Sequence, residues 1–352
     1  MISTSQINAV KKNDIEIGKH LNSGAFGAIY KGRWNNQEVV IKKPLFNDKQ
    51  VDYSFNLNSF KNEVELQEKL SHPNIVKLLD YQYDSADISR CYIVLEFIKS
   101  GDLFDLLNEH TLARKTVPLD WIISILNQIS LALDYLHTLR IIHRDLKPEN
   151  VLINKSNAGL QVKLCDFGFA TKLPNLNSDW FIGQTNPGTL HYVSPEIITS
   201  MRYSFKSDVY ALGMTAYLLV ALKYPFDNIP TNKGLMDAIK NGNRPKTSNL
   251  GPKQCTRFIE QCWQQNPDDR PSVKDLLADD LFNTTTCARE PDILPDILPK
   301  APEVRCTEVV TNNNEDVSLN TAPCPQFPFW SKKRENRETE RPINKRQFCN
   351  IS

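Results

Sequence analysis

Polar residues interrupt two apolar runs in the middle of the chain. Asp145 and Asn150 lie in a charged segment between the apolar pair at residues 141–142 and the apolar run at residues 151–153. A second apolar run ends in the tripeptide Asp-Phe-Gly at residues 166–168. Polar side chains between buried elements must lie in a loop, and burying them is costly unless they are used. Carboxylate and amide oxygens in such a place can bind a hard cation or accept a proton.

Glycine and lysine positions nearer the N-terminus suggest a site for an anion. Gly24 and Gly27 lie between two predicted strands, and glycine lets backbone N–H groups approach an anion without a Cβ clash. Lys42 ends a short strand, and Glu63 lies on the helix that follows. Taken singly, these features also fit a plain turn, a surface charge and a solvated helix face.

The elements that must position these residues differ between the two ends of the domain. Ile15 and Ile17 alternate with a polar residue, and residues 38–42 form a β-branched run, so both predict strands. A helix is predicted to begin near residues 58–59, where Asn and Ser can cap it. Apolar residues at steps of three and four predict a long helix over residues 122–136. The sequence thus predicts a small β-rich lobe, a larger α-rich lobe and a ligand cleft between them.

Composition narrows the class of protein. The 352 residues suffice for one large domain or two ordinary ones, and a net charge of +1 gives no reason to expect a nucleic-acid partner. The eight cysteines form no CxxC pair, so we expect reduced, buried thiols. No signal peptide is visible, and the longest apolar stretch, residues 209–222, is too short to span a bilayer and predicts a buried core helix.

These motifs together resemble those of the eukaryotic protein kinases. The set comprises HRDxxxxN at residues 143–150, DFG at residues 166–168, the glycine-rich loop and the strand lysine, followed by GTLHYVSPE at residues 188–196. Their order and spacing match the family over about residues 14–283. The resemblance implies an α+β fold with two lobes, the N-lobe at residues 14–97 and the C-lobe at residues 98–283.

The segments outside this domain have a different texture. Residues 1–13 would form an N-terminal extension. Residues 284–352 are rich in proline and then in basic residues, and we expect them to be mostly disordered.

The resemblance implies phosphoryl transfer from ATP with Mg²⁺ or Mn²⁺. Asp145 would be the proton acceptor, and Lys147 would contact the γ-phosphate. Asn150 and Asp166 would supply oxygen ligands to the metal, and Thr189 would brace the catalytic loop. For the three metal-binding and proton-accepting residues, the ordinary alternative is a helix cap or a turn.

The resemblance also places the nucleotide. Lys42, held by Glu63, would grip the α- and β-phosphates, and the glycine-rich loop would cover them. Leu95 would be the gatekeeper, the backbone of Glu96 and Ile98 would bind the adenine, and Asp102 would meet the ribose. Apolar side chains would sandwich the base, unless they serve only as core. The residues of the loop and the sandwich are Leu21, Asn22, Ser23, Gly24, Ala25, Phe26, Gly27, Ala28, Ile29, Val40 and Leu152.

Three positions depart from the family pattern. Asn22 replaces the first loop glycine, and we expect the loop to work because Asn tolerates left-handed geometry. Val40 replaces the usual alanine and narrows the adenine site. Gln67, one helical turn after Glu63, replaces an apolar residue of the internal spine and is expected to make the active arrangement less stable.

Other residues indicate the kind of kinase. Lys147 is typical of serine/threonine kinases, and residues 207–213 and 262–271 resemble the tyrosine kinase-like group, in which Arg270 would pair with Glu196. We therefore expect a serine/threonine kinase that acts on proteins in intracellular signalling. An ATP-binding, pseudokinase-like scaffold is the alternative, and a small-molecule phosphotransferase is disfavoured by residues 188–196.

Two expectations concern regulation and location. Ser178 and Thr185 lie in the activation loop, and Arg144 is a ready partner for a phosphate there, so phosphorylation is expected to raise activity. The last four residues, from Cys349, fit a farnesylation motif and follow a basic stretch. These features predict a cytoplasmic protein tethered to membranes through Cys349. Nuclear import through two basic clusters and a plain solvated tail are the alternatives.

Overall fold

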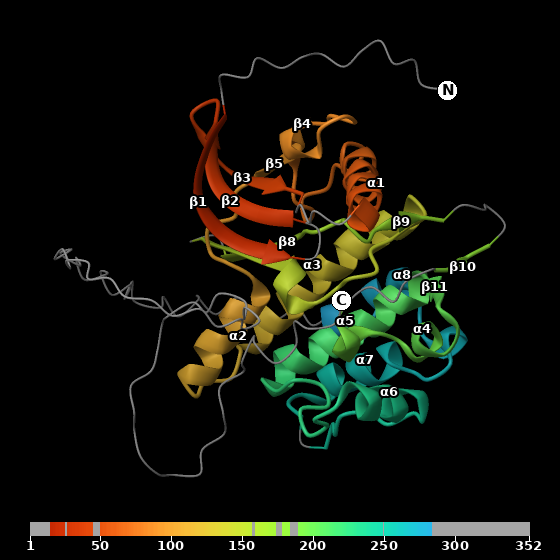
Figure 1. Cartoon of the computed structure of the whole chain (residues 1–352). Coiled ribbons are helices and arrows are strands. Elements are labelled where there is room, and N and C mark those ends of the chain that lie inside the picture. The colour runs from red at the N-terminus through yellow and green to blue at the C-terminus, as the bar shows by residue number, and fades with distance from the viewer. Residues whose placement is uncertain are drawn as a thin grey trace, which may run out of the picture. The chain divides into compact units, whose positions relative to one another are not determined.

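The computed structural model describes residues 15–24, 27–44, 50–156, 159–173, 178–183, 189–248 and 250–283, with the backbone alone for residue 24 and residues 50–56. The N-terminal lobe is built on a five-stranded antiparallel sheet in the order β1-β2-β3-β5-β4 (Figure 1). Its strands are β1 (Ile15–Gly24), β2 (Gly27–Trp34), β3 (Gln37–Lys43), β4 (Leu78–Gln82) and β5 (Tyr92–Glu96).

The central strands β3 and β5 are buried on both faces. Val39, Ile41 and Val94 pack together on one face of the sheet, whereas Ile93 and Leu95 face a second cluster. That second cluster includes Phe60 and Val64 of helix α1 (Gln50–Gln67). The sheet therefore presents the end of β3, and with it Lys42, to the side on which α1 lies (Figure 1).

The predicted start of helix α1 is wrong. The helix begins at Gln50, so Asn58 and Ser59 lie in its interior and do not cap it. The hydroxyl of Ser59 instead donates a hydrogen bond to the carbonyl oxygen of Gly168, at 3.1 Å. A polar residue within a helix can be satisfied by a neighbouring segment, and a capping signal in the sequence does not distinguish the two cases.

The C-terminal lobe is mostly helical and confirms the predicted two-lobed α+β fold. Its main helices are α2 (Leu103–Leu112), α3 (Leu119–Thr138), α5 (Phe205–Ala221), α6 (Asn232–Lys240) and α7 (Lys253–Cys262). The shorter helices are α4 (Pro195–Ser200), α8 (Val273–Leu277) and α9 (Asp280–Asn283), with 3-10 turns η2 (Pro148–Asn150), η3 (Leu190–Tyr192) and η4 (Pro267–Asp269). The 3-10 turn η1 (Ile88–Arg90) lies in the N-terminal lobe, between β4 and β5. Three short antiparallel pairs complete it: β6 (Ile141–Ile142) with β9 (Thr171–Lys172), β7 (Val151–Ser156) with β8 (Gly159–Leu164), and β10 (Trp180–Ile182) with β11 (Arg202–Ser204).

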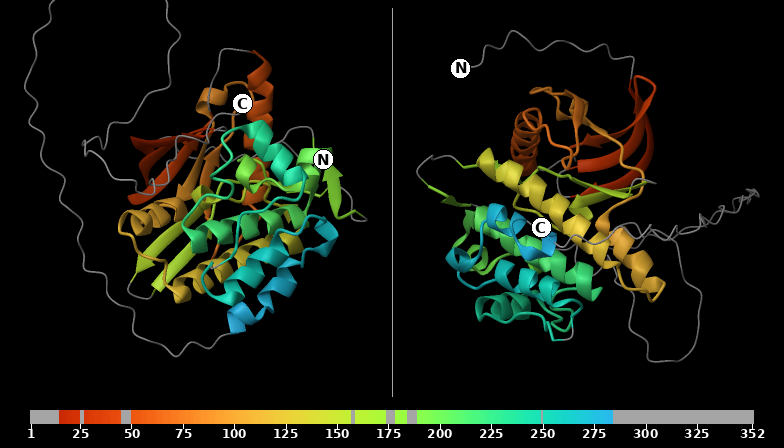
Figure 2. Two further views of the ribbon diagram at one scale, coloured as in Figure 1. Left: turned by 90° about the horizontal axis from the view of Figure 1, so that it is seen from below. Right: turned by 180° about the vertical axis from the view of Figure 1, so that it is seen from behind.

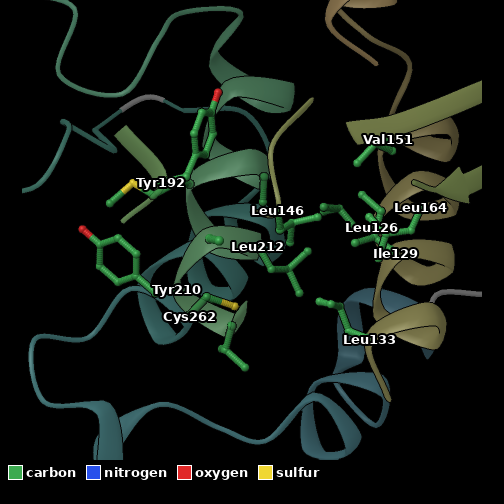
Figure 3. Close-up of a cluster of buried hydrophobic side chains, with 14 of the residues drawn as sticks. Leu126, Ile129, Leu133, Leu146, Val151, Leu164, Tyr192, Tyr210, Leu212 and Cys262 are labelled. Carbon is green, nitrogen blue, oxygen red and sulfur yellow. The ribbon is translucent and has the colours of Figure 1, made fainter. Parts of the chain in front are cut away.

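Helices α3 and α5 form the core of this lobe. Helix α3 packs against α5, α8 and β8, as Figure 2 shows from behind. Leu126, Ile129 and Leu133 of α3 face Leu212 of α5 in the buried cluster of Figure 3. Residues 207–219 of α5 are all buried, which confirms the predicted core helix. A helix that is apolar all round is stable only inside such a core.

Two further expectations can be examined in the part of the chain that the structure describes. Cys91, Cys255 and Cys262 are free and buried, as predicted, and Cys165 is free but only half-buried. The remaining cysteines lie outside the described residues. No described helix is both long enough and apolar enough to cross a membrane.

Candidate active site

Lys42 links three separate elements at the junction of the lobes. Its ammonium Nζ donates to both carboxylate oxygens of Glu63, at 2.7 and 2.8 Å, and to Oδ1 of Asp166 at 2.8 Å. Strand β3 supplies Lys42, helix α1 supplies Glu63, and the loop after β8 supplies Asp166. Lys42 and Glu63 are almost fully buried, and such a pair is tolerated only when its geometry is good and its hydrogen bonds are made.

The charges of this group fix its protonation. Burial alone would lower the pKa of Lys42, but the neighbouring charges of Asp166 and Glu63 outweigh burial and raise it. Burial opposes ionisation of Asp166 too, yet the charge of Lys42 keeps the pKa of that carboxyl below its ordinary value. The site therefore holds an ammonium and an ionised Asp166 at neutral pH.

The catalytic loop between β6 and η2 gathers a second polar group. Lys147 Nζ lies 2.9 Å from Oδ2 of Asp145, and Asn150 Nδ2 donates to the carbonyl oxygen and Oδ2 of Asp145, at 2.7 and 2.9 Å. Asp208 of α5 accepts from the backbone N–H groups of His143 and Arg144, at 2.9 and 3.0 Å. The core helix thus holds the loop, and the loop aligns Asp145.

Burial also shifts the pKa of Asp145. Burial raises the pKa of the Asp145 carboxyl above its ordinary value, and the charge of Lys147 opposes that rise. A raised pKa makes a carboxylate a better proton acceptor near neutral pH. Asp145 is therefore suited to accept a proton from a hydroxyl beside it.

The DFG segment is held in position from both lobes. Asp166 has a left-handed backbone, with φ of 62°, and Phe167 is fully buried with its ring 5.2 Å from that of His143. Helix α1 contributes two contacts that the sequence analysis missed: Ser59 to the Gly168 carbonyl at 3.1 Å, and Asn62 Nδ2 to the Ala170 carbonyl oxygen at 2.9 Å. The signal was present, since Ser59 and Asn62 share one helical face with the predicted Glu63.

The glycine-rich loop lies at the tips of β1 and β2, where Gly24 faces Gly27. A Cβ on Gly27 would lie 2.4 Å from the carbonyl oxygen of Lys43, so only glycine fits there. Asn22 does not use the left-handed geometry that it tolerates, and the expectation that the loop works with Asn22 stays a prediction. Asn22 lies in strand β1 with no positive φ, and its Oδ1 accepts from the N–H of Ser23 at 2.9 Å. Leu21 and Ser23 are exposed on the same strand, and Ala25 and Phe26 lie outside the described residues.

The apolar residues predicted around adenine lie near one another. Val40 and Leu152 are half-buried and pack against the cluster that contains the buried Leu95. Ala28 and Ile29 lie on β2, buried and half-buried respectively. No hydrogen bond joins the backbone of Ile98 to another residue in the described ranges, so its N–H and carbonyl are available to a ligand.

Two polar residues at the same edge have structural roles that the sequence did not reveal. Asp102 caps α2, with its carboxylate accepting from the N–H of Asp105 at 2.8 Å. The carboxylate of Glu96 accepts from the N–H of Lys77 and from Nζ of Lys163, both at 2.7 Å. The pair between Glu96 and Lys163 fixes the end of β5 to β8, the strand that leads to Asp166.

The oxygen ligands present fit a metal held together with a nucleotide. In the described part of the chain, no three His, Cys, Asp or Glu side chains gather into a metal site. Asn150 uses its amide nitrogen on Asp145, so its amide oxygen remains to act as a ligand beside Asp166. One carboxylate and one amide, completed by substrate phosphates, is a normal set for Mg²⁺.

The predicted regulatory residues are placed only in part. The hydroxyl of Ser178 donates to the carbonyl oxygen of Trp180 at 2.7 Å, and the Ser178 carbonyl accepts from Arg140 at 2.6 Å. Arg144 donates elsewhere, as described below. Thr189 lines a small cavity with Asp145, without a hydrogen bond to it in the described ranges, so its bracing role stays a prediction. Thr185 and Cys349 lie outside the described residues.

The predicted ion pair of the larger lobe is confirmed. Nη1 and Nη2 of Arg270 donate to the two carboxylate oxygens of Glu196, both at 2.8 Å. Arg270 is almost fully buried and also donates to the carbonyl oxygens of Gln264 and Lys206, both at 2.8 Å. This network anchors the segment that follows the activation loop.

Comparison with known proteins agrees with this geometry. Residues 15–282 match the model of the protein kinase domain. The chain is 31% identical over 277 residues to a probable serine/threonine-protein kinase of Dictyostelium discoideum, covering 78% of this chain and 20% of that protein. It is 32% identical over 275 residues to Aurora kinase C of Mus musculus, covering 78% and 94%. Nek5 of Homo sapiens is 32% identical over 266 residues, covering 74% and 35%. The chain thus spans only a fraction of several relatives.

Proposed function

Because the chain belongs to the protein kinase family, whose members use ATP and a divalent metal, we propose that it transfers the γ-phosphoryl group of ATP to serine and threonine hydroxyls of proteins. One observation carries the proposal. Lys42 Nζ lies within 2.8 Å of both Glu63 and Asp166, so that one ammonium joins the β-rich lobe to the DFG segment.

The phosphates would be bound mainly by charge and by the backbone. Lys42 supplies a fixed positive charge, and glycines at the tips of β1 and β2 would let backbone N–H groups approach an anion. Asn150 and Asp166 would hold Mg²⁺, which neutralises phosphate charge when bound. Phosphoryl transfer needs little covalent help, so positioning and charge stabilisation account for most of the catalysis.

The substrate hydroxyl would be oriented by Asp145. Its carboxylate would accept the proton as the hydroxyl oxygen attacks phosphorus. Lys147, whose Nζ lies 2.9 Å from Oδ2 of Asp145, would stabilise negative charge on the transferred group. Lys147 also supports serine and threonine as acceptors, in line with the names of two of the relatives above, the Dictyostelium discoideum protein and Nek5, which are serine/threonine-protein kinases.

The experiment is a transfer assay with γ-³²P-labelled ATP, Mg²⁺ and a generic protein substrate. Wild type is compared with Asp166→Ala and with Asp179→Ala, a matched control whose carboxylate is exposed on the activation loop. We expect phosphoserine and phosphothreonine from wild type and the control, and none from Asp166→Ala.

A wild-type chain that binds ATP but transfers no label would contradict the proposal. That result would favour the scaffold alternative, which the departures at Asn22, Val40 and the buried Gln67 support. The side-chain Oε1 of Gln67 has no hydrogen-bond partner in the described part of the chain.

A further inference from the structure

The guanidinium of Arg144, the residue before Asp145, lies against two aromatic rings. Its Cζ is 4.2 Å from the ring centroid of Tyr203 and 5.4 Å from that of Phe181. The two rings are stacked, with centroids 5.4 Å apart. These three residues are referred to below as the aromatic clamp. A guanidinium beside aromatic faces in a dry site is attracted by the negative face of each ring.

The backbone around the clamp brings its rings together. Strands β10 and β11 pair antiparallel with Phe181 directly opposite Tyr203, and the N–H of Gly183 donates to the carbonyl oxygen of Met201 at 2.9 Å. Tyr203 is fully buried, and a Cβ on Gly183 would lie 2.4 Å from its ring. The activation segment is thus fixed to the larger lobe at the point where it meets Arg144.

The other contacts of Arg144 extend this connection to the DFG segment. Nη1 donates to the carbonyl oxygen of Phe169 at 3.3 Å and to Oγ1 of Thr171 at 3.0 Å. The backbone of Arg144 is left-handed, with φ of 69°, and its N–H is held by Asp208. Such a conformation persists only where the surroundings hold it, and here both the main chain and the side chain are held.

We infer that the aromatic clamp sets the catalytic loop in its working arrangement without a phosphate on the activation segment, with Phe181 and Tyr203 acting as positioning residues. Arg144 was expected from the sequence to bind a phosphate on Ser178 or Thr185. In the structure the Ser178 carbonyl is bonded to Arg140, whereas Arg144 is engaged by rings and backbone. The Nε of Arg144 is buried and has no hydrogen-bond partner in the described ranges. Because this atom is buried, a phosphate could bond to it only if the clamp opened first.

The inference rests on the proposed function, and the test uses the whole chain treated with a protein phosphatase and checked by intact mass. Phe181→Ala removes one ring. Trp180→Ala is the matched control, because Trp180 is the exposed neighbour on the same strand. Phe181→Tyr is a conservative variant that keeps an aromatic ring at this position. We expect the unphosphorylated wild type to keep its turnover within about twofold. We expect Phe181→Ala to lower kcat about tenfold with the KM for ATP unchanged, and the other two variants to resemble wild type.

Either of two results would overturn the inference: a large loss of turnover on dephosphorylation that rephosphorylation restores, or wild-type kcat in Phe181→Ala. Hydrogen exchange at the Gly183 amide gives a readout that does not depend on activity. Faster exchange in Phe181→Ala than in Trp180→Ala supports the clamp even if the wild type transfers no phosphate, in which case only the proposed function fails. Equal exchange in the two variants counts against the clamp.

Discussion

Two buried ion pairs, one in each lobe, have similar geometry and different surroundings. The Lys42–Glu63 pair is 2.7 Å long and the Arg270–Glu196 pair is 2.8 Å long. Lys42, Glu63 and Arg270 are almost fully buried, and the side chain of Glu196 is 9% exposed. Arg270 also donates to two backbone carbonyl oxygens, and these bonds hold its guanidinium in a single orientation. Lys42 shares its charge with Asp166, a second carboxylate whose side chain is 33% exposed. We conclude that Arg270–Glu196 is a structural pair that maintains the fold, and that Lys42–Glu63 is a functional pair whose lysine can exchange the carboxylate of Asp166 for a phosphate.

The largest expected effect is on the structural pair. Arg270→Ala leaves Glu196 buried without its cation, and we expect the free energy of unfolding to fall by about 3–5 kcal/mol. Urea denaturation measures it. The control is Arg257→Ala, which removes an exposed guanidinium that pairs with Asp279 and Asp280 and should cost no more than about 1 kcal/mol. Equal losses in the two variants would remove the distinction between these sites.

The functional pair, Lys42–Glu63, should show the opposite pattern: a large loss of activity and a smaller loss of stability. Lys42→Met is expected to lower the transfer rate about 100- to 1000-fold, because a fixed charge next to the phosphates is lost. Its cost in stability should be smaller than that of Arg270→Ala, since burial already raises the pKa of Glu63 and lets it become neutral. Rates are measured per folded molecule, with Lys31→Met, a half-buried lysine on strand β2, as control. Unchanged turnover in Lys42→Met would contradict the comparison.

Gln67 tests how firmly helix α1 holds the functional pair. It is almost fully buried, and its Nε2 makes only a long hydrogen bond of 3.3 Å, to the Val76 carbonyl oxygen. Gln67→Leu removes a buried acceptor that has no partner in the described ranges and should raise the free energy of unfolding by about 1 kcal/mol. Thermal denaturation checks this.

Gln128→Leu is the matched control for that variant. Both ends of the Gln128 amide are bonded, Oε1 by Asn74 and Val162 and Nε2 to Ser124 and Leu160. Its replacement should therefore destabilise the protein. If Gln67→Leu destabilised the protein as much as Gln128→Leu does, the unpaired Oε1 of Gln67 would not be lowering the stability of the wild type.

The smallest expected effect is a shift in the pH dependence of kcat. Turnover needs an ionised Asp145, so activity is present above the pKa of that carboxyl and is lost as pH falls through it. Burial raises this pKa and the charge of Lys147 opposes the rise, so Lys147→Gln should move the acid limb of kcat to higher pH. The pH profile at saturating ATP measures the shift, with Lys155→Gln as an exposed control. An acid limb that stays in place would show that Lys147 does not act on Asp145.

The sequence predicted the groups that carry charge better than those that hold them. Asp145, Asn150 and Asp166 were visible because polar residues between apolar runs are rare in a buried place. The contacts of Ser59 with Gly168 and of Glu96 with Lys163 were missed, since each joins residues far apart in the chain and the sequence does not show which residue is the partner. Helix α1 began earlier than predicted for the same reason, because a distant carbonyl satisfies Ser59 inside the helix.

Binding and chemistry can be separated most directly at Asp145. In Asp145→Asn the cluster around Lys42 is intact, so the affinity for ATP with Mg²⁺ should stay within about threefold, while the single-turnover transfer rate should fall about 10²- to 10⁴-fold. Calorimetry and rapid quench on the same preparation give both values. An unchanged transfer rate, or the loss of ATP binding together with transfer, would contradict the account.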